Sequence, residues 1–200
     1  IEAHYKCKKL MPLLHLPVQS GSTKILKNMN RDHTVNEYLE KIEKLRIKNP
    51  LMKFSSDFII AYPNETKADF DETVLLMKKV EFINSYSFIY SPRPGTPAAN
   101  MKEIEPKIAK ERLSFFQNIA DEIKKKYRNK LINSTAKVLF ENKTRNQTEY
   151  FGRDEYFNSI IVTSSKNLIG KIKKVKISHC NRNTLFGEIL PDISQKDFAA

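Results

Sequence analysis

The feature that most constrains the fold is an apolar run followed by a small polar loop, a pattern that recurs through the first half of the chain. It reads LHLPVQSGS at residues 14–22, DFIIAYPNET at 57–66 and SFIYSPRPGT at 87–96. A short apolar run bounded by turn residues is typical of a strand buried on both faces, as in a parallel sheet. Because ligands bind beyond the carboxyl ends of such strands, the three loops are expected to line one shared site.

Helix signals separate these runs. Thr34 and Glu37 have the spacing of a capping box, and Thr66 and Asp69 repeat it. Pro106 suits the first turn of a further long helix. The alternation of strands and helices therefore predicts an α/β domain built from parallel units with right-handed crossovers.

The chain has only five glycines, and their positions are informative. Gly21 and Gly95 fall in the first and third polar loops, where they are expected to permit tight turns and a close approach of the backbone to a ligand. Gly152, Gly170 and Gly187 are expected at bends between short strands.

After residue 131 the helical pattern gives way to short strand-like segments at 134–141, 150–162, 168–180 and 184–190. Short strands at such spacing predict a small antiparallel β-barrel of OB-like character. The predicted organisation is therefore a partial parallel (β/α) domain over 1–131, a β-barrel over 132–192, and a tail over 193–200.

Charge and cysteine content narrow the class of partner and the compartment. The net charge of +12 favours a polyanion, and RNA is the commonest candidate, although a lysine-rich genomic composition would also produce it. Cys7 and Cys180 lack metal-ligand spacing and are compatible with a reducing cytoplasm. No apolar stretch approaches the length needed to cross a bilayer, so no membrane contact is expected.

Several motifs resemble those of the radical SAM methylthiotransferases, and within them the MiaB-type enzymes that modify tRNA. The motifs are LHLPVQSGS, MNR at 29–31, SSDFIIAYPNET at 55–66 and YSFIYSPRPGTPAA at 86–99. LIGK at 168–171 and NTLFGEI at 183–189 resemble the TRAM domain of that family, a small RNA-binding barrel. The resemblance implies a partial radical SAM barrel followed by a TRAM domain.

The resemblance also implies an activity and its cofactors. The MiaB-type enzymes of the family insert a methylthio group at carbon 2 of N6-isopentenyladenosine beside the tRNA anticodon, using S-adenosyl-L-methionine and two [4Fe-4S] clusters. The three-cysteine CxxxCxxC loop of the family is absent from this sequence, and two distant cysteines cannot replace it. The chain is therefore expected to be the C-terminal half of a monomeric cytoplasmic enzyme, without its N-terminal half and inactive alone.

Two alternatives stay open at this point. One is a methylthiotransferase of the same family that acts on a ribosomal protein, and the other is a non-catalytic RNA-binding remnant. The sequence also departs from the family at the second loop, where Ala61 and Asn64 replace the glycines of a Gly-Phe-Pro-Gly turn. Asn tolerates a positive φ, so the turn is expected to survive, whereas Ala61 is expected to crowd the cofactor.

The candidate site residues fall into two groups. The tips Gln19, Asn64 and Arg93 are expected to converge at one rim, and His15, inside an apolar run, is expected to be a core residue. The candidate cofactor-binding residues are Gln19, Ser20, Asp57, Glu65, Arg93 and Thr96. The candidate RNA-binding residues are Arg153, Tyr156, Lys171, Lys173, Lys174, Lys124 and Arg128, where basic and aromatic side chains suit phosphate contact and base stacking.

Overall fold

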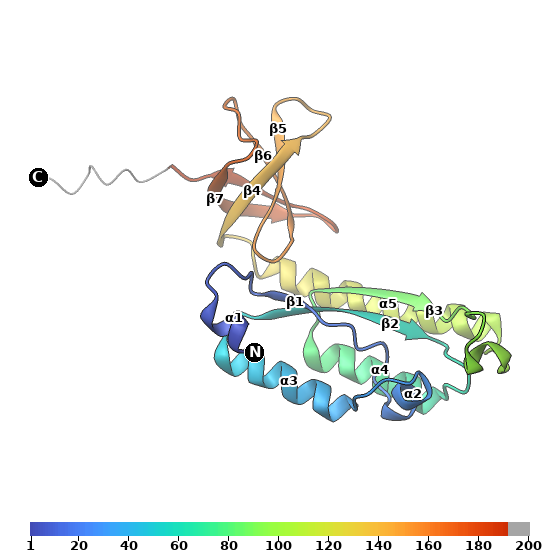
Figure 1. Ribbon diagram of the computed structural model, residues 1–200. Coiled ribbons are helices and arrows are strands. Elements are labelled where there is room, and N and C mark those ends of the chain that lie inside the picture. Colours follow the sequence, from blue (N-terminus) through green and yellow to red (C-terminus); the bar gives the residue numbers. More distant parts are fainter. Residues whose placement is uncertain (192–200) are drawn as a thin grey trace, which may run out of the picture. The chain divides into compact units, whose positions relative to one another are not determined.

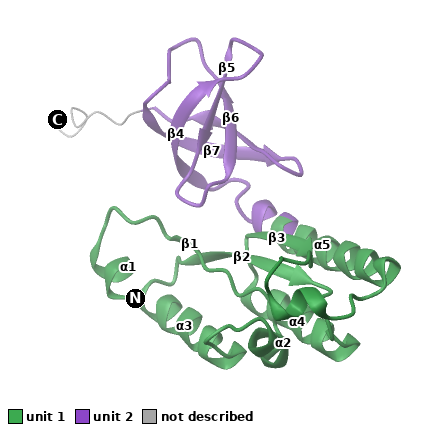
Figure 2. Ribbon diagram, turned by 45° about the vertical axis from the view of Figure 1, so that its right-hand side comes forward, with its two compact units in different colours: residues 1–124 green, residues 125–200 purple. Residues whose placement is uncertain are grey.

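The computed structural model describes residues 1–191, and the predicted tail over 193–200 lies outside the described residues (Figure 1). The chain divides into two compact units, residues 1–124 and residues 125 onward (Figure 2). The division falls inside the last helix, before the boundary expected at residue 131. Each unit has its own hydrophobic core.

The first unit contains a three-stranded sheet in the order β1-β2-β3, with both strand pairs parallel, as predicted. The first apolar run, which extends back to residue 10 in the sequence, forms a strand over only three residues because Pro12 and Pro17 have no N–H to donate to the ladder. The elements of this part are α1 (Glu2–Lys6), β1 (Leu13–His15), α2 (Thr23–Asn28), α3 (Val35–Lys48), β2 (Lys53–Ile60), α4 (Lys67–Val80), β3 (Asn84–Ile89), a 3₁₀ helix (Pro97–Asn100) and α5 (Pro106–Asn129).

Only one face of this sheet is packed against helices. Phe54, Phe58 and Ile60 of β2 are buried in a core that α3, α4 and α5 complete. On β3, Tyr86 and Phe88 are 56% and 58% exposed. The helices described within residues 1–124 therefore leave the opposite face of the sheet open.

The two predicted capping boxes are confirmed. The Thr34 side chain accepts from the Glu37 N–H, and the Thr66 side chain accepts from the Asp69 N–H, with the reciprocal bonds also present. These caps fix where α3 and α4 begin, and the start of α4 lies against the QSGS loop through Asp69.

The second unit is a closed barrel of five strands in the order β4-β5-β6-β8-β7. All neighbouring pairs are antiparallel except β6 and β8, which are parallel. An odd number of strands cannot close with antiparallel pairs alone, so one parallel pair is required. The predicted small barrel is confirmed, and its pairing, expected to be purely antiparallel, is corrected to a mixed one. The strands are β4 (Thr135–Lys143), β5 (Glu149–Arg153), β6 (Ser159–Thr163), β7 (Ile172–Cys180) and β8 (Leu185–Ile189).

The barrel glycines serve two different purposes. Gly170 has a φ of +74° and occupies a turn, as expected. Gly152 and Gly187 instead lie within strands, where a Cβ would be 2.4 Å from the Leu139 carbonyl oxygen and 2.3 Å from that of Lys176. In both cases the register of the partner strand shifts at the same place, which is the signature of a β-bulge. These two glycines therefore let strands approach closely where the barrel bends.

Candidate functional site

A pocket of about 830 Å³ lies at the carboxyl ends of β2 and β3, beside the loop that follows β1. This is the location expected from the parallel sheet. The pocket combines aromatic and apolar walls with a few polar groups, which is typical of small-molecule sites. The predicted site residues that line it are Gln19, Asp57, Arg93 and Thr96.

Gln19 is held in the pocket wall by its backbone. Its N–H donates to the Asp57 carbonyl at 3.0 Å, and its carbonyl accepts from the Ile59 N–H at 2.9 Å. These bonds extend the β1–β2 pairing beyond Pro17. Gln19 has a φ of +76°, an uncommon conformation for a residue other than glycine. Backbone strain of this kind persists where the surrounding structure fixes it, and it occurs often at ligand sites.

Asp57 reaches the pocket from the open face of the sheet and contacts a histidine. His15 Nε2 lies 3.4 Å from Asp57 Oδ2, and His15 Nδ1 lies 2.9 Å from Ser55 Oγ. The Tyr86 ring meets the imidazole edge-on, with centroids 6.3 Å apart. His15 is therefore an exposed side chain on the open face, and the expectation of a core histidine was wrong. A three-residue strand that is packed on one face only cannot be recognised from its apolar composition.

Two tyrosines that the sequence reasoning missed complete the pocket. Tyr62 and Tyr90 pack edge-to-face, with ring centroids 5.0 Å apart. Tyr62 donates its hydroxyl to the Asn28 carbonyl at 2.9 Å, and burial raises the pKa of this phenol. The Tyr90 hydroxyl oxygen is buried and has no hydrogen-bond partner among the described residues. Tyr90 directly follows β3, so the rule that placed Arg93 at the site would also have found it.

The unpartnered Tyr90 hydroxyl provides a test of whether the pocket suits the implied cofactor. A buried hydroxyl without a partner is costly, so a ligand that supplies a hydrogen-bonding atom there gains affinity. S-adenosylmethionine offers ribose hydroxyls, an adenine ring, and an amino acid end that carries an ammonium and a carboxylate group. The carboxylate of Asp57, the guanidinium of Arg93 and the aromatic rings match these groups in chemistry. The residues present therefore fit the cofactor.

The Arg93 loop is a tight turn on the pocket rim. The Thr96 hydroxyl donates to the Arg93 carbonyl at 2.8 Å, and the Thr96 N–H donates to the same oxygen at 3.2 Å. Gly95 has a φ of +84°, as its position in a turn suggested. Arg93 makes no ion pair with any described residue, so its guanidinium is available for an anion.

Ser20 and Gly21 are turned away from the pocket and toward α4. Ser20 is fully buried, with its hydroxyl 3.3 Å from Thr73 Oγ1 and accepting from the Ser22 N–H at 3.1 Å. A Cβ on Gly21 would lie 2.4 Å from the Thr73 Cα. The close neighbour of this glycine is therefore a helix backbone, which corrects the expectation of an approach to the ligand.

Glu65 is also a buried group outside the pocket lining. Its Oε1 accepts from Arg112 at 2.7 Å and from the Ala61 N–H at 3.1 Å. Burial raises the pKa of Glu65, although Arg112 opposes this shift. Asn64 has a φ of +66°, as expected for a residue at a position where the family has glycine. Ala61 also has a positive φ, of +60°. Asn64 does not line the pocket, so of the three expected tips only Gln19 and Arg93 meet there.

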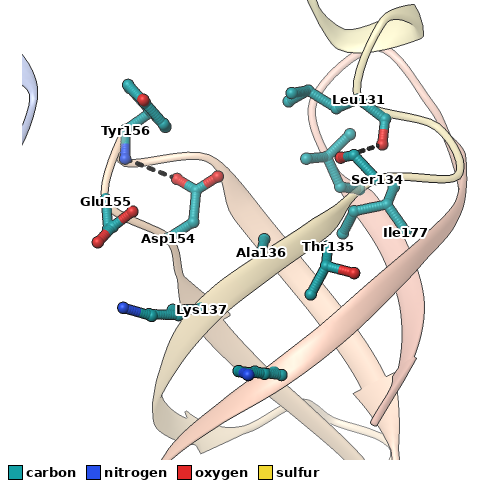
Figure 3. A pocket seen from close by; sticks show the side chains of 11 residues that line it. Leu131, Ser134, Thr135, Ala136, Lys137, Asp154, Glu155, Tyr156 and Ile177 are labelled. Carbon is teal, nitrogen blue, oxygen red and sulfur yellow. Dashed lines mark hydrogen bonds between the residues drawn. The ribbon is translucent and has the colours of Figure 1, made fainter. Parts of the chain in front are cut away.

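The predicted RNA-binding residues are spread over the second unit and the end of α5. The Arg153 guanidinium lies 5.3 Å from the Phe151 ring and 5.6 Å from the Phe157 ring, so this basic and aromatic cluster is formed. Tyr156 and Lys174 line a smaller pocket in the barrel (Figure 3). Lys171 is exposed, Lys173 is half-buried, and Lys124 lies within α5. Arg128 is buried and donates to the Arg182 carbonyl, which makes it a structural residue of this unit.

Comparison with known protein families agrees with both parts of this architecture. Residues 4–77 match the radical SAM superfamily, and residues 129–190 match the TRAM domain. The chain carries part of a radical SAM domain followed by a TRAM domain. The resemblance drawn from its motifs is confirmed.

The chain is also similar to several curated proteins named tRNA-2-methylthio-N(6)-dimethylallyladenosine synthase. It is 48% identical to that of Pelagibacter ubique (strain HTCC1062) over 98% of this chain and 44% of the relative. It is 41% identical to that of Ruegeria sp. (strain TM1040), over 95% of this chain and 43% of the relative. It is 43% identical to that of Wolbachia pipientis wMel, over 92% of this chain and 43% of the relative. The chain thus spans less than half the length of these relatives.

Two features are absent from the part of the chain that the structure describes. Within residues 1–191, no helix has the length and apolar character of a membrane span. The same residues contain no group of three or more His, Cys, Asp or Glu side chains arranged to hold a metal ion.

Proposed function

We propose that this chain is the C-terminal half of a cytoplasmic, monomeric tRNA-2-methylthio-N(6)-dimethylallyladenosine synthase. Residues 1–131 would complete its cofactor-binding domain, and residues 132–192 would hold the tRNA. The observation that carries the proposal is the pocket at the carboxyl ends of β2 and β3, in a chain that aligns over 98% of its length with a protein of that name. The tRNA-related names of the relatives favour this reading over a ribosomal-protein substrate.

The pocket residues would bind S-adenosylmethionine and orient it. When bound, the cofactor supplies the methyl group and the radical chemistry that an unactivated aromatic C–H bond requires. The Gln19 amide and the Tyr90 hydroxyl would hydrogen-bond its ribose or amino acid portion. Arg93 would bind its carboxylate, for which a guanidinium is well suited, and Asp57 would accept from its hydroxyl or ammonium groups.

The other candidate residues would act by positioning these groups. Ser20 fixes the loop that follows Gln19 against α4. Glu65 holds the turn after β2 through Ala61 and Arg112, and Thr96 closes the turn that presents Arg93. The two [4Fe-4S] clusters would be held by the N-terminal half of the same enzyme.

A matched pair of tyrosines tests the cofactor pocket. Tyr90→Phe removes the buried hydroxyl, and about a five- to tenfold loss of affinity for S-adenosylmethionine is expected, because one hydrogen bond contributes about 1 kcal/mol. Tyr86→Phe, within β3 and outside the pocket lining, is expected to bind like the parent protein. Equilibrium dialysis of the full-length enzyme with labelled cofactor makes the measurement. Equal losses in both variants, or no binding at all, would contradict the proposed pocket.

A second prediction concerns RNA. The chain itself is expected to bind a tRNA anticodon stem-loop with an affinity that falls steeply as salt increases, because phosphate contacts release counterions. Fluorescence anisotropy at several salt concentrations gives the slope. An affinity that stays constant between low and high salt would exclude phosphate contacts as its basis and count against an RNA-binding barrel.

A further inference from the structure

The barrel contains a second pocket, of about 230 Å³, at the end where β4 begins (Figure 3). Its accessible apolar surface comes from the half-buried Leu131 and Ala136, while Ile177 and Leu185, which also border it, are buried core residues. The turn that carries Asp154, Glu155 and Tyr156 lies on one side, and the segment from Leu131 to Thr135 lies on the other. An apolar floor with a few polar groups at its rim suits a small flat ligand.

Two lysines at this pocket face each other in an arrangement that does not favour stability. Lys137 of β4 and Lys174 of β7 are directly opposite in the antiparallel register, and both side chains are exposed. Like charges in directly opposed positions destabilise a sheet. Neither lysine makes an ion pair with a described residue. An anion that binds between them would relieve the repulsion.

The turn at residues 154–156 carries a carboxylate that hydrogen bonds hold in place and that makes no ion pair with a described residue. Asp154 is buried and accepts from the Tyr156 N–H at 2.8 Å, from the Asn158 N–H at 2.9 Å and from Asn158 Nδ2 at 2.8 Å. These bonds fix the turn. Glu155, the next residue, is exposed and makes no ion pair among the described residues. The two carboxylate oxygens of Glu155 are therefore available as hydrogen-bond acceptors beside the aromatic ring of Tyr156.

We propose that this pocket binds one unpaired guanosine of the RNA partner. The inference rests on the proposed function, because it takes the partner to be RNA. The base lies on the apolar floor beside Tyr156, its N1–H and N2 amino group donate to the two oxygens of Glu155, and its phosphate lies between Lys137 and Lys174. Guanine is the base whose Watson–Crick edge offers two adjacent donors to one carboxylate, and bases in single-stranded RNA are read on that edge.

The experiment compares single-stranded oligouridines that carry one central guanosine, inosine, adenosine or uridine, with binding followed by fluorescence anisotropy on the full chain. Inosine has N1–H but lacks the 2-amino group. The guanosine oligomer is expected to bind about tenfold more tightly than the inosine oligomer, because a bidentate contact is lost. In Glu155→Gln, which has one acceptor oxygen, the ratio of guanosine to inosine affinity is expected to fall to about one.

The lysines have a separate readout. Lys137→Gln and Lys174→Gln are each expected to weaken all four oligomers alike and to reduce the salt slope by about 0.7. Lys166→Gln, outside the pocket, serves as the matched control. If no oligomer binds, both the RNA-binding part of the proposed function and this inference fail. If all four bind equally and Glu155→Gln changes nothing, the inference alone is overturned.

Discussion

Replacing Gly21 by alanine is expected to destabilise the first unit by at least about 3 kcal/mol, because the new methyl group has no space. Its Cβ would lie 2.4 Å from the Thr73 Cα and 2.6 Å from the Glu72 carbonyl oxygen, and both are backbone atoms of α4 that cannot move alone. The loop or the helix must shift as a body. Urea unfolding followed by circular dichroism at 222 nm reports on this unit, which contains nearly all of the helix.

Gly95→Ala is the matched control for this substitution. Gly95 has a positive φ, but nothing lies within 4 Å of the position that a Cβ would take there, so alanine incurs only the conformational cost of about 1 kcal/mol. The two variants therefore separate steric overlap from backbone conformation. A Gly21→Ala protein as stable as Gly95→Ala would show that the loop does not lie against α4 as described. Because Gln19 is two residues away, Gly21→Ala should also weaken the cofactor binding that we propose for the pocket.

The second large effect is expected at Asp69, which joins α4 to the loop before α2. Its carboxylate accepts from Ser22 Oγ at 2.7 Å, from Lys24 Nζ at 2.8 Å and from Thr66 Oγ1 at 2.6 Å. Burial alone would raise the pKa of Asp69, but these hydrogen bonds hold it well below its ordinary value of 3.8. Asp69→Asn is expected to cost about 2 to 3 kcal/mol at neutral pH, because charge-assisted bonds and a helix cap are weakened.

The pH dependence of this effect has a definite sign. A carboxylate with a lowered pKa in the folded state contributes its full stabilisation above the unfolded value of 3.8 and loses it as the pH falls through the folded value. The difference in unfolding free energy between the parent protein and Asp69→Asn should therefore shrink below about pH 4. Asp71→Asn, which removes an exposed pair with Lys67, should leave stability nearly unchanged. A difference that is constant from pH 7 to pH 3 would refute this account.

Local signals were the part of the fold that could be predicted from the sequence. The capping boxes at Thr34 and Thr66 involve residues three apart, so their spacing alone identifies them. The parallel order of the sheet followed from the alternation of strands and helices. For the same reason Gln19, Asn64 and Arg93 were expected at one rim, since the carboxyl ends of parallel strands meet at one edge. Gln19 and Arg93 do line one pocket, whereas Asn64 does not.

Contacts between distant segments were the part that could not be predicted. Ser20 bonds to Thr73, Glu65 bonds to Arg112, and these partners are 53 and 47 residues away. The sequence does not distinguish a polar residue that hydrogen-bonds to a distant partner in the core from one that binds a ligand. The reverse error occurred at His15, which is exposed on the face of the sheet that the described helices of the first unit do not cover.

The parallel pairing of β6 with β8 has a consequence for biosynthesis. β8 is the last described strand, and it hydrogen-bonds to both β6 and β7. Domains begin to fold while the ribosome is still extending the chain. The ring of strands cannot be completed until residues 185–189 have emerged, so until then β6 and β7 offer bare edges to other nascent chains. Translational stalling just before this segment should leave the earlier α/β portion folded and the nascent barrel exposed to aggregation.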